Sequence, residues 1–245
     1  MKKIPLSLQL WSLRDDMRAD FARTVSEVAR IGYEGVELAG YGNLDVNGAQ
    51  AALAAAGLKV SGMHVGIGIM RSEPDKVIGD ALLLGTSHVT VPWWPPALFV
   101  SPAAAEKVGE ELNAIGARFR AHGLRLSYHN HAGEFKLLEG RPAFDWILGA
   151  AEPRNLAAQV DVYWVQAGGY SPEKFLREQG ARVPLVHLKD ETELGLGPVD
   201  FNAVFSAVES IGAAEWYIVE QEKYNHTPLE SVRRCFEQLK KWGKA

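Results

Sequence analysis

Short apolar segments alternate with helical segments eight times along this chain. The apolar segments are rich in β-branched residues, as strands are, and lie at about residues 4–11, 35–39, 59–66, 88–94, 124–131, 156–164, 183–189 and 215–221. The helical segments follow them at 20–31, 47–56, 73–84, 101–122, 143–150, 171–179, 201–211 and 227–242. Eight successive strand and helix units predict an α/β fold, a single-domain (β/α)8 TIM barrel over residues 1–245.

Residues that typically start or end helices support this division. Glycine follows six of the helical segments, at Gly32, Gly57, Gly85, Gly123, Gly180 and Gly212. Two of these same segments open with a serine and a proline, Ser101 with Pro102 and Ser171 with Pro172. The alternative is an open doubly wound sheet, but no GxGxxG or GxxxxGK[ST] motif opens a helix to support it.

The composition excludes several classes of protein. With 26 Lys and Arg against 30 Asp and Glu, and a net charge of −4, the chain lacks the basic face that nucleic-acid phosphates require. No stretch reaches the length of a membrane-spanning apolar segment, and the N-terminus has no signal-peptide pattern. We therefore expect a cytoplasmic protein that binds neither nucleic acid nor membranes. The single cysteine, Cys235, excludes an internal disulfide.

Three polar residues lie near the ends of successive predicted strands in the C-terminal half. They are Asp161 in LAAQVDVYW, His187 in VPLVHLKD and Glu220 in EWYIVEQE. Residues at equivalent ends of neighbouring parallel strands meet at one end of a barrel, where active sites of this fold are built. One imidazole and two carboxylates meeting in this way predict a metal site.

Strand alternation sorts the side chains that face the barrel interior, because neighbours along a strand point to opposite sides. In the first strand, Ser7, Gln9 and Trp11 fall opposite a set of leucines that should meet the helices. The same rule places these residues on the interior side: Glu37, His64, His129, His131, Lys189 and Glu222.

An oxygen-rich set of ligands with one imidazole favours Mn²⁺, with Mg²⁺, Co²⁺ or Zn²⁺ as alternatives. Such an ion can bind the adjacent carbonyl and hydroxyl oxygens of a sugar and stabilise the enediolate that forms when a carboxylate removes the proton between them. Carboxylates on both sides of the sugar allow a proton to leave one face and return to the other. This is the chemistry of an epimerase or an aldose–ketose isomerase.

Several segments together resemble one known superfamily. They are GYEGVELAG, YHNHAGEF, DVYW, VHLKD followed by LGLGPVDF, and YIVEQE. They resemble the xylose isomerase-like TIM barrel superfamily and, within it, the sugar phosphate isomerase/epimerase group. The resemblance implies one divalent ion per chain, held by Glu134, Asp161, His187 and Glu220, with Glu134 and Glu220 as catalytic carboxylates. It also implies a small sugar or keto-sugar as substrate, and a homo-oligomer remains an option because relatives commonly form dimers or tetramers.

The chain departs from this pattern at the fifth strand. Relatives such as the ketose 3-epimerases carry the first ligand glutamate within the strand, whereas here the strand ends in Tyr128, His129, Asn130 and His131, and Glu134 comes later. Either histidine is an alternative ligand or a contact to the substrate. The YHNH form also resembles members that act by elimination, so a lyase, either a keto-inositol dehydratase or a keto-glycoside β-eliminating enzyme, is the alternative function.

Further candidates for contact with the substrate come from the interior positions and from tryptophans, whose rings stack on the apolar faces of sugars. They are His131, His129, His64, Glu37, Lys189, Trp11 and Trp94. The segment VPWWPP, with Trp93 and Trp94, is the expected wall of the site. Lys189 has an alternative role as the ion-pair partner of Glu222. An apurinic endonuclease, also found in this superfamily, needs a basic DNA-facing surface and a larger set of zinc ligands, which this chain lacks.

Overall fold

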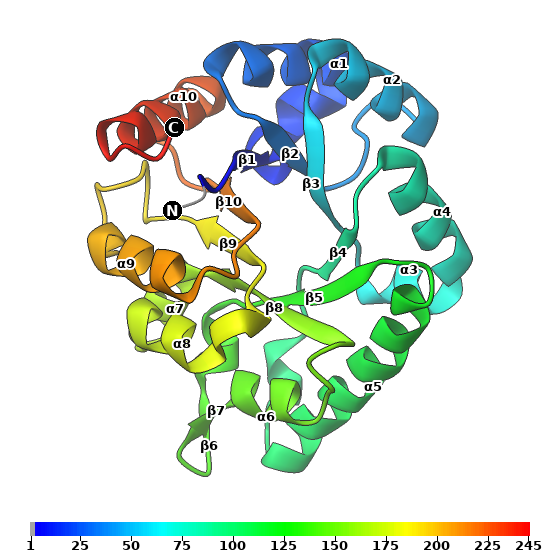
Figure 1. Ribbon diagram of the computed structural model, residues 1–245, viewed down its shortest axis with the longest axis vertical. Coiled ribbons are helices and arrows are strands. Elements are labelled where there is room, and N and C mark those ends of the chain that lie inside the picture. The colour runs from blue at the N-terminus through cyan, green and yellow to red at the C-terminus, as the bar shows by residue number, and fades with distance from the viewer. Residues whose placement is uncertain (1–2) are drawn as a thin grey trace.

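The computed structural model describes residues 3–245 and contains eight parallel strands that close into a barrel (Figure 1). The strands are β1 (Leu6–Gln9), β2 (Gly35–Leu38), β3 (Lys59–His64), β4 (His88–Val91), β5 (Arg125–His129), β8 (Leu156–Asp161), β9 (Leu185–Leu188) and β10 (Trp216–Val219). They follow one another around the barrel in chain order, and β1 closes the ring by pairing with both β2 and β10. The predicted (β/α)8 barrel is confirmed.

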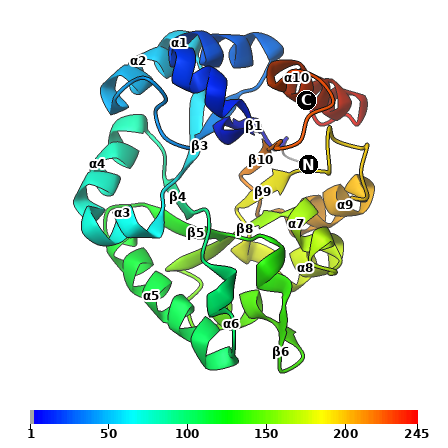
Figure 2. The same cartoon turned by 180° about the vertical axis from the view of Figure 1, so that it is seen from behind.

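Helices surround the barrel on all sides (Figures 1 and 2). The long ones are α1 (Arg14–Ile31), α2 (Val46–Ala56), α4 (Pro74–Leu84), α5 (Pro102–Arg120), α6 (Ala143–Gly149), α8 (Pro172–Gln179), α9 (Phe201–Ile211) and α10 (Pro228–Lys241). The two predicted serine starts are real caps, since each side chain accepts a hydrogen bond from the backbone N–H three residues on. Within residues 3–245, no helix is both long and apolar enough to cross a membrane.

Several predicted strands were too long. After β1 the chain turns into a 3-10 helix, η1 (Leu10–Leu13), and after β8 it enters a short helix, α7 (Val162–Ala167). Each turn still buries some apolar side chains, Leu10 and Leu13 in η1 and Val162 and Val165 in α7, so the apolar pattern continues past the end of the strand. The prediction also lacked several small elements: α3 (Ile67–Ser72), the hairpin β6 (Leu137–Leu138) and β7 (Arg141–Pro142), and the 3-10 turns η2 (Pro96–Leu98), η3 (Ala132–Phe135) and η4 (Gly180–Arg182).

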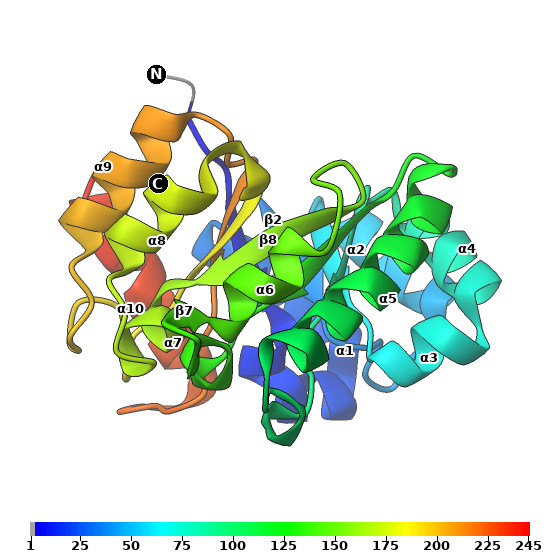
Figure 3. The ribbon, with the colours of Figure 1, turned by 90° about the horizontal axis from the view of Figure 1, so that it is seen from below.

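Figure 3 shows the helices packed around the outside of the strands. The apolar core lies between the strands and the helices, while buried polar side chains line the inside of the barrel. Leu6 and Leu8 of β1 face outward and are almost fully buried against the helices. On the inner side, the hydroxyls of Ser7 and Ser61 lie 2.7 Å apart, and the Gln9 amide donates to Glu37 over 2.6 Å. The strand alternation read from the sequence is therefore correct, and it leaves a hydrogen-bonded polar layer beneath the ends of the strands.

A close approach between α5 and the segment before β8 gives a stability prediction. A Cβ atom on Gly116 would lie 1.9 Å from the Asn155 carbonyl oxygen, whereas a Cβ on Gly79, exposed in α4, would meet no atom within 4 Å. We expect Gly116→Ala to lower the free energy of unfolding by at least about 2 kcal/mol, because backbone must move apart. Gly79→Ala, the matched control, should raise it by about 0.5–1 kcal/mol through helix propensity. Urea unfolding measures both, and equal effects would contradict the packing argument.

Candidate active site

Four buried side chains converge where neighbouring strands end. His129 ends β5, Asp161 ends β8, His187 lies in β9, and Glu220 directly follows β10. Each offers a potential ligand atom, and these four atoms all lie within 4.8 Å of one another. The convergence follows from the topology, because β5, β8, β9 and β10 are successive neighbours in the barrel and Asp161 pairs directly with His187.

The hydrogen bonds of this cluster fit a bound divalent ion. His187 Nδ1 lies 3.0 Å from Glu220, while its Nε2 lies 2.7 Å from Glu37 Oε2 on the far side of the ring. A carboxylate behind the imidazole is the usual arrangement that orients a metal-binding histidine. Asp161 Oδ1 accepts the Trp164 N–H at 3.0 Å, but its Oδ2 is buried without a hydrogen-bond partner among residues 3–245. A buried carboxylate oxygen of this kind is satisfied by a cation.

The pKa values of the cluster also indicate where a cation would bind. Burial raises the pKa of Asp161 to about 7, and the attraction of Lys189 does not offset it. Burial acts against Glu220 as well, but Lys189 and His187 outweigh it and hold the pKa of Glu220 well below its usual range. Burial also disfavours charge on His187, yet Glu37 and Glu220 raise its pKa to about 10. Asp161 is thus the carboxylate whose charge the protein compensates least, and it also carries the unpartnered oxygen.

Glu37, expected to contact the substrate, instead supports the cluster from below. Its oxygens accept hydrogen bonds from the amides of Gln9 and Gln159, each over 2.6 Å, and lie 2.7 Å from His187 and 3.0 Å from His64. Burial opposes its charge, but the two histidines lower its pKa well below the usual value. Glu37 therefore lies against the His64 and His187 imidazoles, and it is not among the residues that line the pocket. Gln159, which the sequence analysis missed, completes this layer.

Glu134, expected as the first metal ligand, is not brought into the cluster. It lies in η3, fully buried, where Oε1 accepts the Tyr128 hydroxyl at 2.6 Å and Oε2 accepts the His131 backbone N–H at 2.9 Å. Both oxygens are used by Tyr128 of β5 and by the backbone just after that strand, because the loop turns the carboxylate back toward β5. His129, an alternative ligand in the sequence analysis, occupies the fourth position instead.

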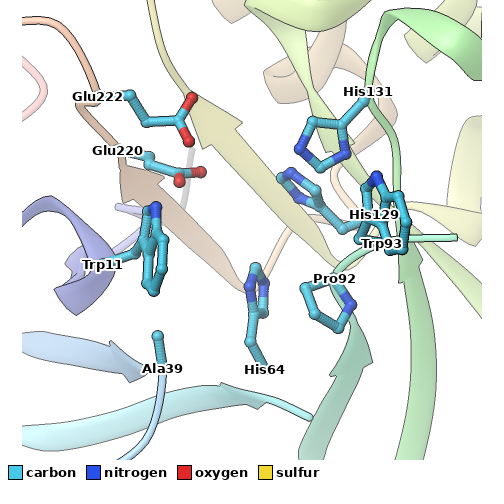
Figure 4. Close-up of a pocket in the computed structure, with 9 residues that line it drawn as sticks. All are labelled: Trp11, Ala39, His64, Pro92, Trp93, His129, His131, Glu220 and Glu222. Atoms are coloured by element: carbon cyan, nitrogen blue, oxygen red, sulfur yellow. The ribbon is translucent and has the colours of Figure 1, made fainter. Parts of the chain in front are cut away.

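A pocket of about 420 Å³ opens above the cluster, and Figure 4 shows its lining. Glu220 and Glu222 lie on one side of it, with His131 and His129 across from them. Trp11 and Trp93 stand at the pocket with 39% and 51% of their surface exposed. The pocket therefore offers exposed indole rings over a polar floor, which is suited to a small polar molecule with apolar C–H faces.

Besides Glu37, two expected contact residues lie apart from the pocket lining, Trp94 and Lys189. The Trp94 side chain is 4% exposed, with the Arg71 guanidinium 5.4 Å from the centre of its ring, and its neighbour Trp93 takes the place at the pocket. Lys189 forms a close ion pair with Glu222 and lies 3.9 Å from Glu220. Lys189 therefore positions both pocket carboxylates, which is the ion-pair role considered as its alternative.

His131 and His64 reach the pocket as expected. Burial lowers the pKa of His131 to about 4, so its ring is neutral near pH 7, and its buried Nδ1 has no partner among residues 3–245. His64 lies 2.7 Å from the Gln159 amide oxygen and is fixed by the supporting layer. His131 therefore presents a neutral imidazole ring to the pocket.

Mutation can distinguish whether His129 or Glu134 is the fourth metal ligand. We expect His129→Ala to lose bound metal, because its ring nitrogen belongs to the converging set. Glu134→Gln should keep full metal content and lose only the hydrogen bonds within η3, with a stability cost of about 1–3 kcal/mol. Metal analysis after dialysis, with urea unfolding alongside, measures both effects. Metal loss in Glu134→Gln, with retention in His129→Ala, would restore Glu134 as the ligand.

Residues 25–242 match the family model described as xylose isomerase-like TIM barrel. Among curated proteins, the chain is 26% identical over 153 residues to an inosose dehydratase of Salmonella typhimurium, a match that covers 51% of this chain and 50% of the relative. The chain thus spans about half the length of that relative.

The fold of this chain is similar to those of two proteins with solved structures. A sugar phosphate isomerase/epimerase from Parabacteroides distasonis superposes with a TM-score of 0.86 at 22% identity, covering 98% of this chain and 94% of that one. A D-allulose 3-epimerase from Methylomonas sp., in complex with D-allulose, gives a TM-score of 0.75 at 15% identity, with 98% of each chain covered.

Proposed function

The chain belongs to the xylose isomerase-like TIM barrel family, and on that premise we propose that it is a divalent-metal-dependent isomerase or epimerase of a sugar or keto-sugar. The observation that carries the proposal is the buried set of His129, Asp161, His187 and Glu220 beneath an open pocket. Two carboxylates and two imidazoles suit Mn²⁺, with Mg²⁺, Co²⁺ or Zn²⁺ as alternatives. When bound, such an ion would polarise a substrate carbonyl and stabilise the negative charge that develops next to it.

The protein groups around the pocket supply the proton transfers. Glu220 faces the pocket and is held ionised by Lys189 and His187, so we assign it as the base that removes the proton next to the carbonyl. His131 lies across the pocket from it (Figure 4), where its neutral ring would donate a hydrogen bond to a substrate oxygen while Glu220 returns the proton to the neighbouring carbon. Trp11 and Trp93 would stack on the sugar ring and exclude water from the reacting carbon.

One observation favours a second candidate, a lyase. Glu134 faces its own loop, so the pocket has carboxylates on one side and imidazoles on the other. A carboxylate base opposite a neutral imidazole suits elimination, in which Glu220 takes the proton next to the carbonyl and passes it to the departing hydroxyl or aglycone oxygen, while the His131 N–H donates a hydrogen bond to that oxygen. The partial match to an inosose dehydratase, whose name describes such a loss of water, supports this candidate as well.

Metal analysis and product mass test the proposal together. The purified protein is analysed for bound metals, and its turnover of ketoses, keto-inositols and 3-keto-glycosides is followed by mass spectrometry with and without added Mn²⁺. About one ion per chain with a product of unchanged mass supports the isomerase or epimerase. A product lighter by water or by an aglycone supports the lyase instead. Turnover that survives complete removal of metal would contradict both.

A further inference from the structure

A second cavity lies at the opposite end of the barrel, where the strands begin. Its volume is about 450 Å³, and it is lined by residues at or just before the starts of β4, β5, β8, β9 and β10. Ala157 of β8 lines this cavity and Asp161 of the same strand belongs to the metal cluster, so about 13 Å of strand separates the two sites. The cavity is therefore distinct from the candidate active site.

The lining of this second cavity is strongly basic. Four arginines, Arg120, Arg125, Arg154 and Arg182, line it together with a single carboxylate, that of Glu215. The whole chain carries a net charge of −4, so this concentration of positive charge is opposite in sign to the protein as a whole. Arginines that share a concave surface repel one another unless an anion lies between them.

The guanidinium groups of Arg120 and Arg182 are held by hydrogen bonds and keep further donors for a ligand. Arg182 donates to the carbonyls of Leu156 and Ala151 over 2.8 and 2.9 Å, and the Arg120 Nε donates to the Asn155 side chain over 3.0 Å. These bonds use one edge of each group, and in residues 3–245 the outer Nη atoms of Arg120 have no partner. Planar guanidinium groups fixed in this way match the paired oxygens of a phosphate.

Glu215 does not cancel this charge. Its oxygens are taken by Arg125 at 2.5 Å and His88 at 3.0 Å. The carboxylate is therefore already paired, and Arg154 is paired in turn with Glu152 over 2.5 Å, so Arg120 and Arg182 carry the surplus positive charge of the lining.

We propose that this arginine-lined cavity at the strand starts is a binding site for phosphate, either as the free ion or as the phosphate group of a small metabolite. A dianion would offset two of the surplus charges, and the volume of about 450 Å³ leaves room for the organic part of a phosphate ester. Helix C-termini at this end of the barrel disfavour anions, so binding depends on the arginines. The proposal stands independently of the metal site.

Isothermal titration with inorganic phosphate and with glycerol 2-phosphate, at one fixed ionic strength, tests the site. The test variant is the double substitution R120Q/R154Q, which removes two exposed arginines that bond only to side chains. The matched control R30Q/R233Q removes two exposed arginines that pair on helix surfaces away from the cavity. A third variant, Asp161→Asn, tests whether phosphate binds at the metal cluster instead, because only binding there should change with this substitution.

We expect saturable binding of one phosphate per chain with a dissociation constant of about 1 mM or below. The affinity should fall at least about tenfold in R120Q/R154Q and stay unchanged in R30Q/R233Q and Asp161→Asn. Binding of both probes identifies a phosphate ester as ligand, and binding of inorganic phosphate alone identifies the free ion. No saturable binding, an equal loss in both double variants, or a loss confined to Asp161→Asn would overturn the proposal.

Discussion

Asp161→Asn should lose its bound divalent ion and at least about 10²-fold in turnover while the barrel stays folded. The substitution is nearly isosteric, and the amide oxygen can still accept the Trp164 N–H that Asp161 Oδ1 accepts now. What changes is the second oxygen, which is buried without a partner among residues 3–245 and becomes an NH₂ group that cannot bind a cation. Metal analysis after dialysis and steady-state kinetics measure the two losses.

Asp45→Asn is the matched control for this experiment. Asp45 also caps a helix, by accepting the Gly48 N–H at 2.8 Å at the start of α2, but it is exposed and far from the barrel interior. It should keep metal, turnover and stability, since an asparagine caps a helix as well as an aspartate. Full metal content and activity in Asp161→Asn would remove Asp161 from the metal site. Unfolding of that variant alone would instead assign it a structural role.

Removing His187 tests the same metal site but is expected to lower the stability of the protein as well. His187→Ala should also lose the ion, but it leaves Glu37 and Glu220 buried without the imidazole that now lies between them. A loss of stability is therefore expected together with the loss of metal, which makes Asp161→Asn the cleaner test of function.

Strand alternation predicted the inner layer of the barrel well. It placed Glu37, His129 and His187 on one face, and the same rule applied to LAAQVD puts Gln159 on the face of Asp161, so this missed residue was within reach of the sequence. The rule works here because each of these residues lies within a strand, where side-chain direction follows from the backbone, and it holds at Glu37 although the pairing of β2 with β3 shifts register there.

The residues whose positions were not predicted lie beyond the strand ends. Glu134 is in a 3-10 turn, and Trp94 follows Pro92, past the last residue of β4. In such segments the direction of a side chain depends on tertiary contacts, such as the Tyr128 hydroxyl that holds Glu134. The sequence therefore identified the tryptophan segment as a wall of the site without determining which of its two rings faces the pocket.

Glu220→Gln should lower turnover by at least about 10²-fold while keeping part of the metal affinity. The amide retains one oxygen for the ion but cannot accept a proton, so the loss should appear in kcat. The proton next to the carbonyl should also stop exchanging with deuterium in D₂O. If Glu220 only binds the substrate, Glu220→Gln should instead raise KM and leave kcat and the deuterium exchange unchanged.

Glu222→Gln identifies which of the two pocket carboxylates is the base. Glu222 also lines the pocket, but it lies outside the converging ligand set and pairs with Lys189. If Glu220 is the base, Glu222→Gln should retain the deuterium exchange and lose much less turnover, because Lys189 remains 3.9 Å from Glu220. Loss of exchange in Glu222→Gln, with its retention in Glu220→Gln, would transfer the role of base to Glu222 and leave Glu220 as a metal ligand only.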